Sequence, residues 1–237
     1  MRRLPVLCTL CVICAACVLA AYVLAACSVP PQLIGREASD SAASAATAEP
    51  APTAPPPVDP QNLQTATLAG GCFWSMQRML DAVPGVITTT VGYTGGTVPN
   101  PTYEQVSSET TGHAEAVEVV YDSAQISYAE LLDAYWHDID PVTADGQFCD
   151  FGPSYRSAIF YHDAEQQRTA EASKQALAAS GRFDQPIVTE IVGAGEFYRA
   201  EDYHQKFYLK SPDQYAAYRA ACGRDERLYQ IWGTPSG

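Results

Sequence analysis

The chain has 237 residues and a formal net charge of −13 at neutral pH. This acidic balance argues against nucleic acid or an anionic membrane surface as the partner, because both repel an acidic protein. Of the eight cysteines, only Cys72, Cys149 and Cys222 lie beyond residue 27. Three cysteines are too few for a disulfide scaffold, and an odd number indicates a reactive thiol if the chain is exported.

The first 26 residues are predicted to be a signal peptide. Arg2 and Arg3 precede an uncharged, largely apolar run over 4–26, which is the pattern of a secretory leader. The run ends in Leu-Ala-Ala before Cys27, which resembles a bacterial lipobox. That resemblance implies cleavage before Cys27 and attachment of a lipid to it. An uncleaved membrane helix is the alternative, because the run is long enough to span a bilayer.

Residues 27–64 are predicted to be a lipidated Cys27 followed by a disordered tether. Positions 28–64 hold eight prolines, eight alanines and no aromatic residue, so this segment has nothing with which to form a core. Its expected function is to hold a domain away from a membrane surface. Residues 65–237 remain, and they are enough for one domain with a proper core.

Hydrophobic periodicity predicts six successive elements in this domain, in the order strand, helix, strand, strand, helix, strand. They cover residues 65–69, 72–82, 86–93, 114–121, 128–138 and 156–161. The βαββαβ order predicts an α+β fold with a ferredoxin-like core. A further helix over 164–180, a strand over 186–192 and a helical C-terminal tail are expected to follow.

Cys72 lies at the corner between the first strand and the first helix, directly after Gly70 and Gly71. Unpaired N–H groups and the helix dipole at such a corner favour an anion, which lowers the pKa of a thiol and makes it a nucleophile. Phe73 and Trp74 are placed to wall a small apolar pocket beside the sulfur. The alternative is an inert cysteine at a buried helix start.

Other side chains that are candidates for catalysis follow along the chain. Alternation over 114–121 puts Glu115 on a face with two valines, where burial raises the pKa of a carboxyl and suits it to act as an acid. A solvent-exposed carboxylate at the strand end is the alternative. Tyr93 ends a strand before Thr94, so its hydroxyl is expected to face the same pocket; the alternative is a core residue whose hydroxyl reaches water. The aromatic and acidic loop over 146–157 is typical of a site, unless its phenylalanines only fix the loop to the core. The four histidines lack metal-binding spacing and are taken as surface or structural, so no metal is predicted.

Five segments together resemble the peptide methionine sulfoxide reductase A family, in its order and at its spacing. They are Gly-Gly-Cys-Phe-Trp at 70–74, Val-Gly-Tyr-Thr-Gly-Gly at 91–96, Gly-His-Ala-Glu-Ala-Val at 112–117, the loop over 147–157 and Ala-Glu-Asp-Tyr-His-Gln at 200–205. The resemblance implies an enzyme without cofactor that reduces methionine S-sulfoxide, free or in peptides and proteins. It also implies a sulfenic acid on the catalytic cysteine and a thioredoxin-like protein as reductant.

The resemblance also implies roles for individual residues, carried over by position. Cys72 is the nucleophile, Glu115 the acid at the sulfoxide oxygen, Tyr93 and Tyr155 hydroxyls that hold this oxygen, Asp150 a carboxylate acting through water, and Phe73 and Trp74 the walls that receive the methyl group. Cys222 is the predicted resolving thiol, because a C-terminal segment can swing onto the site, and Cys149 is the alternative. The chain differs from many members at Cys149, where they carry Asn, and in its tail.

The sequence therefore predicts a monomeric reductase, anchored by a lipid on Cys27 in the cell envelope and facing the periplasm or the outside. Its expected task is the repair of oxidised envelope proteins. Two alternatives remain open on the sequence alone. One is a thiol peroxidase, which also uses a reactive cysteine and a sulfenic acid. The other is a non-enzymatic surface lipoprotein that keeps these segments as scaffold.

Overall fold

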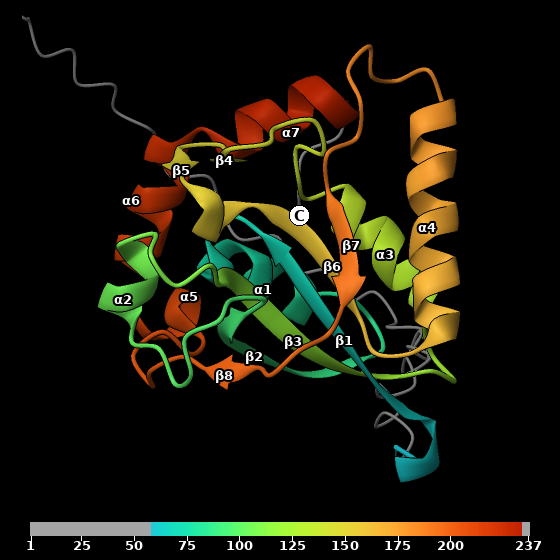
Figure 1. Cartoon of the computed structure of the whole chain (residues 1–237), viewed down its shortest axis with the longest axis horizontal. Coiled ribbons are helices and arrows are strands. Elements are labelled where there is room, and N and C mark those ends of the chain that lie inside the picture. The colour runs from blue at the N-terminus through green and yellow to red at the C-terminus, as the bar shows by residue number, and fades with distance from the viewer. Residues whose placement is uncertain (1–57, 234–237) are drawn as a thin grey trace, which may run out of the picture. The chain divides into compact units, whose positions relative to one another are not determined.

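The computed structural model describes residues 58–233 (Figure 1). The predicted signal peptide, the lipid site at Cys27 and the tether up to residue 57 lie outside the described residues. Regular structure begins before the predicted boundary at residue 65, with a 3₁₀ turn η1 (Pro60–Asn62) and strand β1 (Leu63–Gly70). Asp59 stabilises this start, because its side chain accepts a hydrogen bond from the Gln61 N–H at 3.0 Å. Between residues 58 and 233, no helix combines the length and apolarity that crossing a membrane requires.

Six strands form one mixed sheet in the order β7-β6-β1-β3-β2-β8. Besides β1 they are β2 (Val86–Thr94), β3 (Ala114–Asp122), β6 (Ser157–Tyr161), β7 (Glu190–Gly193) and β8 (Tyr198–Arg199). Strand β1 lies between β3 and β6 and is antiparallel to both, whereas β6 and β7 are parallel. The four strands β6-β1-β3-β2 are those of the predicted βαββαβ unit. The expected α+β fold with a ferredoxin-like core is confirmed.

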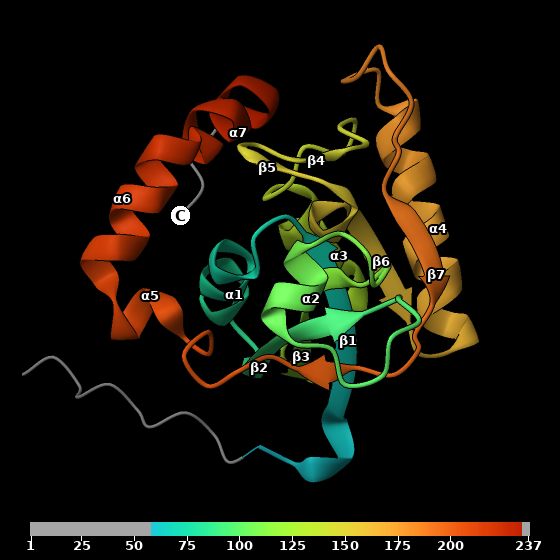
Figure 2. The same cartoon turned by 60° about the vertical axis from the view of Figure 1, so that its left-hand side comes forward.

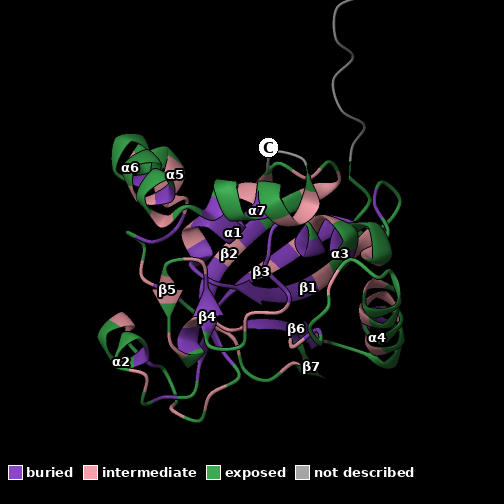
Figure 3. Cartoon of the chain, turned by 90° about the horizontal axis from the view of Figure 1, so that it is seen from above, coloured by how far each residue is buried: buried purple, intermediate pink, exposed green. Residues whose placement is uncertain are grey.

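Helices α1 (Phe73–Asp81) and α3 (Tyr128–Trp136) contribute to the main hydrophobic core with the sheet, and α4 (Ala164–Ala179) packs outside α3. Met76 of α1 and Leu132 of α3 belong to the same buried cluster as Leu68 of β1. Figure 3 shows the buried residues gathered in the strands, whereas α4 carries mostly exposed and intermediate ones. The corner at Cys72 is therefore built on the buried end of strand β1.

Several short elements were not expected from the sequence. They are α2 (Tyr103–Ser107), the hairpin of β4 (Gly146–Gln147) and β5 (Asp150–Phe151), the turn η2 (Pro153–Tyr155) and β8. The strand expected over 186–192 begins only at Glu190. Pro186 has no N–H to donate, and Val188 donates its N–H to the Pro141 carbonyl instead of to a neighbouring strand.

The predicted helical tail consists of α5 (Phe207–Lys210), α6 (Pro212–Cys222) and α7 (Arg224–Trp232). In Figure 2 these three helices form an arc that passes α1 and ends over the β4–β5 hairpin. The arc brings residues from the end of the chain to the corner between β1 and α1. This arrangement places Cys222 in the neighbourhood of the predicted site.

Candidate active site

The corner that carries Cys72 depends on glycine. Gly71 has a φ of 83°, in the left-handed region, and a Cβ atom there would lie 2.6 Å from the Cβ of Gln147. Only glycine permits both this backbone conformation and this close approach. Cys72 follows as the N-cap of α1 and is 6% exposed. The predicted strand-to-helix corner is confirmed, and Cys72 is the one cysteine of residues 58–233 that is outside a disulfide.

Glu115 of β3 lies at the start of α1. Its Oε2 accepts a hydrogen bond from the Phe73 N–H at 3.0 Å, and its side chain is buried, with 3% exposed. Burial raises the pKa of Glu115 to about 8; the Phe73 N–H opposes this shift, and the carboxylates of Asp150 and Glu109 add to it. The predicted burial and raised pKa are confirmed. Near neutral pH most Glu115 carboxyls carry a proton that they can donate to an oxygen beside Cys72.

The Cys72 thiol is not activated in this state. Burial and the nearby charge of Glu115 raise the pKa of Cys72 far above its ordinary value, while interactions with the Tyr218 hydroxyl and the Trp74 N–H lower it only in part. The prediction that the helix N-terminus lowers this pKa is therefore wrong here. The physical reason is that the Phe73 N–H is bonded to Glu115 and the sulfur is removed from water.

Two tyrosine hydroxyls lie beside the pair of Cys72 and Glu115. The hydroxyls of Tyr103 of α2 and Tyr155 of η2 interact with each other, and the charges of Glu115 and Cys72 act on both. Burial is the largest cause that raises the pKa of Tyr103 to about 12 and lifts the pKa of Tyr155 higher still. Both hydroxyls stay protonated near neutral pH and can donate to a substrate oxygen.

Tyr155 was predicted, whereas Tyr103 was missed. The sequence does hold a signal for the position of Tyr103, because Thr102 and Gln105 form a capping box that starts α2 at this residue. The longer helix α3 begins with the same motif, a capping box formed by Ser127 and Glu130.

The position of Tyr93 does not support the role predicted for it. Tyr93 is the cross-strand neighbour of Glu115, but it is fully buried and its hydroxyl donates to Glu201 Oε2 at 2.8 Å. The other oxygen of Glu201 accepts the Tyr103 N–H at 2.9 Å. Tyr93 therefore acts on the site through Glu201, which fixes the start of α2. The period of a strand predicts the face of a side chain, but it does not predict the partner of a hydroxyl at its end.

Phe73 and Trp74 form an aromatic wall together with residues of the tail. The ring of Trp74 stacks on that of Phe207 with a centroid distance of 3.9 Å, and its Nε1 donates to His204 Nδ1 at 3.1 Å. The centroid of His204 lies 5.0 Å from that of Phe73. His204 was taken as surface or structural, and it proves to be a buried residue that orients Trp74. The sequence did indicate a role for His204 near the site, because it lies in the segment over 200–205 that resembles the family.

Cys149 and Cys222 are joined in a disulfide, with their Cα atoms 4.9 Å apart. The two alternatives for the resolving thiol are thus partners of each other. The sulfur of Cys222 lies 3.9 Å from Asp150 Oδ2 and 3.9 Å from the Tyr218 hydroxyl, which is hydrogen-bonded to Cys72. Cys149, Asp150 and Cys222 also bring potential metal-ligand atoms within 4.8 Å of one another. Two of these three are disulfide sulfurs rather than thiolates, so the set does not fit a metal in this state.

The segment that follows Cys222 is anchored to the domain through Arg224. Arg224, two residues after Cys222, is 2% exposed and donates to Asp138 Oδ2 at 2.7 Å and to the Gly70 carbonyl at 3.3 Å. Its guanidinium also lies over the ring of Phe148, 4.4 Å from the centroid. The buried charge of Arg224 is stabilised by its partner Asp138, and this ion pair holds the start of α7 against the domain. Cys222, two residues before Arg224, is thereby held near the site.

The fold and the site define a thiol-dependent oxidoreductase with a buried cysteine, a protonated carboxyl beside it and a neighbouring disulfide. A family model described as "Peptide methionine sulfoxide reductase" matches residues 64–236. The chain is 56% identical over 168 residues to "Peptide methionine sulfoxide reductase MsrA" of Ligilactobacillus salivarius, which covers 71% of this chain and 97% of that protein. It is 52% identical over 170 residues to the protein of the same name from Bacillus subtilis, with 72% and 96% covered.

Two solved structures are similar as well. "Methionine sulfoxide reductase A of Corynebacterium diphtheriae" has a TM-score of 0.57 and 36% identity, over 65% of this chain and 77% of that chain. Mxr1 from Saccharomyces cerevisiae in reduced form has a TM-score of 0.59 and 31% identity, over 66% and 90%. The chain belongs to the peptide methionine sulfoxide reductase MsrA family. This membership selects the methionine sulfoxide reductase from the three alternatives that the sequence left open.

Proposed function

We propose that this enzyme reduces methionine S-sulfoxide by attack of Cys72 on the sulfoxide sulfur, and that Cys149 and Cys222 together restore the Cys72 thiol. The observation that carries the proposal is the placement of Cys72, the one free thiol among residues 58–233, beside a carboxyl that is protonated near neutral pH. A sulfoxide sulfur is a poor electrophile until its oxygen accepts a proton. A nucleophile and an acid side by side meet both requirements of the step.

In the first step, Glu115 gives its proton to the sulfoxide oxygen, while Tyr103 and Tyr155 hold this oxygen by hydrogen bonds. The sulfur of Cys72 bonds to the sulfoxide sulfur and gives its thiol proton to the Glu115 carboxylate, and the hydroxyl then passes from the substrate sulfur to Cys72. Methionine leaves with the two electrons that Cys72 gives up, and Cys72 becomes a sulfenic acid. Phe73 and Trp74 supply the apolar wall against which the methyl group on sulfur rests.

In the second step, the Cys222 thiol attacks the Cys72 sulfenic acid, forms a Cys72–Cys222 disulfide and releases water. The Cys149 thiol then attacks the sulfur of Cys222, which frees Cys72 as a thiol and leaves the Cys149–Cys222 disulfide. This final pairing is the one present in the structure. The order follows from position, because Cys222 lies 3.9 Å from the Tyr218 hydroxyl that bonds Cys72.

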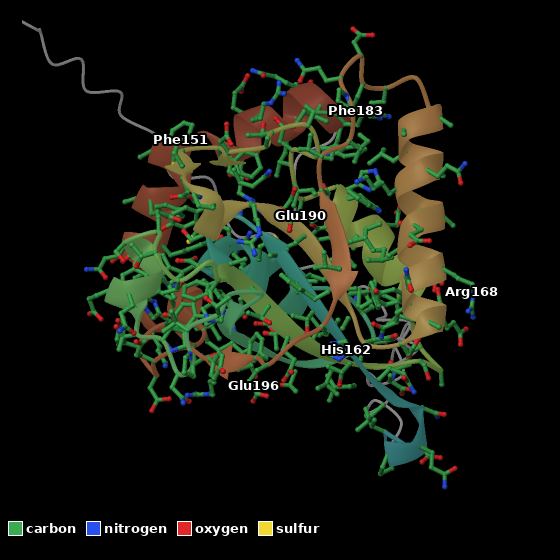
Figure 4. All side chains as sticks on the ribbon, viewed as in Figure 1. Phe151, His162, Arg168, Phe183, Glu190 and Glu196 are labelled. Carbon is green, nitrogen blue, oxygen red and sulfur yellow. A yellow bond between two sulfur atoms is a disulfide. The ribbon has the colours of Figure 1, made fainter. Side chains whose placement is uncertain are left out.

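The remaining disulfide must be reduced from outside, and a thioredoxin-like dithiol is the proposed reductant. Cys149 is exposed, and Phe151, two residues further, is 74% exposed at the outer edge of the hairpin (Figure 4). An exposed disulfide sulfur is the one that an external thiolate can attack. The external thiol is therefore proposed to attack Cys149 and to form a mixed disulfide with this residue.

The proposed place of action is the cell envelope, with the lipid on Cys27 as anchor and oxidised envelope proteins as substrates. Support comes from the uncharged run after Arg2 and Arg3, the lipobox-like end at Cys27 and the Pro/Ala-rich segment that follows. The enzyme is proposed to act as a monomer and to require no cofactor, since the thiols carry all the electrons of the reaction. Mass spectrometry of the membrane fraction tests the anchor by detecting a lipid on Cys27.

A single-turnover experiment tests the reaction. Protein lacking residues 1–27 is fully reduced, freed of reductant and mixed with either epimer of methionine sulfoxide, and methionine is counted per protein. The expected result is release from the S epimer and none from the R epimer. Release from neither epimer by a folded protein would overturn the proposal.

A further inference from the structure

Tyr218 of α6 lies against the catalytic sulfur. Its hydroxyl donates its one proton to Asp150 Oδ2 at 2.5 Å and interacts with the Cys72 thiol, in a contact where the hydroxyl can only accept. Its ring meets that of Trp74 edge-on, with a centroid distance of 5.8 Å and an interplanar angle of 86°. A sulfoxide must bring its sulfur to within bonding distance of the Cys72 sulfur and its methyl group to Trp74. Tyr218 therefore occupies contacts that the substrate needs.

The Cys149–Cys222 disulfide holds Tyr218 in this position. Cys222 follows Tyr218 by four residues, so the two side chains share one face of α6, and the Cys222 sulfur lies 3.9 Å from the Tyr218 hydroxyl. On the other side of the disulfide, Cys149 immediately precedes Asp150. One covalent bond thus fixes the donor of the hydrogen bond between Tyr218 and Asp150 and also its acceptor.

The segment after Cys222 can remain in place when this bond opens. Gly223 has a φ of 66° and separates α6 from α7, and a Cβ atom at this position would meet nothing within 4 Å. Arg224 at the start of α7 stays tied to Asp138 and to the Gly70 carbonyl. Arg219 in the last turn of α6 donates from Nε to Oδ1 of Asp225 on α7 at 2.9 Å, so this turn moves about Gly223 without displacing α7 only when that ion pair opens.

We propose that Tyr218 is a redox-linked gate: the Cys149–Cys222 disulfide holds it at Cys72 in place of the substrate, and reduction of this disulfide opens the site. This inference rests on the proposed function of the two cysteines. The gate has a chemical purpose. If Cys72 reacted again while Cys149 and Cys222 were still joined, its sulfenic acid would have no thiol partner and would be exposed to irreversible oxidation to sulfinic acid.

The number of methionines released without reductant tests the gate. Fully reduced wild-type protein is expected to release one methionine per chain, because the disulfide then forms and closes the site over the regenerated Cys72. Tyr218→Ala is expected to release two, because Cys72 of the disulfide form is open to a second sulfoxide. Tyr229→Ala on α7, at a tyrosine that is 56% exposed, is the matched control and is expected to release one.

Two further readouts separate the gate from the proposed function. Mass tagging of thiols after the reaction, on protein lacking residues 1–27, must find one free thiol in the wild type, namely Cys72, and none in Tyr218→Ala. In the isolated disulfide form, iodoacetamide must alkylate Cys72 at least tenfold faster in Tyr218→Ala than in the wild type, with equal melting temperatures. Two methionines from the wild type, or one from a folded Tyr218→Ala protein, overturn the gate. No methionine from any variant, or failure of Cys149 and Cys222 to pair, instead overturns the proposed function.

Discussion

The corner at Cys72 and the helical segment at Cys222 bring two cysteines to one site by different physical means. The corner is local, because a strand, two glycines and a helix start within a few residues determine where Cys72 lies. The position of Cys222 depends on partners far away in the chain, namely Cys149, Asp138 and the Gly70 carbonyl. The position of the proposed nucleophile Cys72 is thus set by local structure. The position of the proposed resolving residue Cys222 is set partly by a disulfide, which can open on reduction.

The largest expected effect is at the corner. Cys72→Ser should abolish release of methionine in every assay, because a hydroxyl cannot supply the electrons that a thiol gives to the sulfoxide. The Cys149–Cys222 disulfide should still form under oxidising conditions, and thiol counting with a melting curve checks that the variant is folded. Residual turnover near the wild-type rate would remove Cys72 from its role.

Glu115→Gln should slow the sulfoxide step by about 10²- to 10⁴-fold, the usual contribution of a general acid. Stopped-flow measurement of methionine release in a single turnover is the appropriate assay, because it isolates this step. A normal rate in this variant would show that another group protonates the sulfoxide oxygen.

The pH profile sharpens the same assignment. The active form of Glu115 is the protonated one, and its pKa is raised to about 8. The Glu115-dependent rate should therefore be level below pH 8 and fall as pH rises through this value. In Glu115→Gln the rate should not fall as pH rises through 8, because glutamine does not titrate. An unchanged fall in the variant would assign the profile to another group.

Cys222→Ser should separate the contribution of the Cys72 corner to catalysis from that of the Cys222 segment. The first release of methionine should keep its rate, since the corner is intact, whereas repeated turnover with a dithiol protein should largely cease. The oxidised wild type should also be more stable than this variant by about 4 kcal/mol, from closure of a loop of 73 residues. Denaturant unfolding measures this difference, and sustained wild-type turnover would contradict the relay.

Tyr103→Phe should have a smaller effect than these. Loss of one hydroxyl at the sulfoxide oxygen should slow the sulfoxide step by about tenfold, because Tyr155 and Glu115 remain. The single-turnover assay used for Glu115 also measures this change. An unaffected rate would mean that Tyr103 does not touch the substrate oxygen.

Tyr93→Phe should have the smallest effect of all on chemistry. It removes the hydrogen bond to Glu201 and should cost about 1 kcal/mol of unfolding free energy while the sulfoxide step changes less than in Tyr103→Phe. Parallel unfolding and single-turnover measurements on the two variants check this contrast. A larger rate loss for Tyr93→Phe than for Tyr103→Phe would reverse the assignment of the two hydroxyls.

The sequence by itself determined the features that depend on local periodicity and backbone sterics. The βαββαβ order, the glycine-dependent corner at Cys72 and the burial of Glu115 all follow from patterns within about ten residues. The boundary of the domain and the short elements around α2 and the β4–β5 hairpin were less predictable, because a few residues carry little periodic signal.

Only the tertiary structure decided which side chains meet at Cys72. In the tertiary structure Cys149 is joined to Cys222, and Tyr218 lies near the sulfur of Cys72. Tyr103, and not Tyr93, is the tyrosine that lies near Cys72 and Glu115. It also reversed the expected direction of the pKa shift of Cys72, because burial and the Glu115 charge outweigh the helix start. These outcomes depend on contacts between residues far apart in the chain and on exclusion of water, and neither is encoded in the spacing of neighbouring residues.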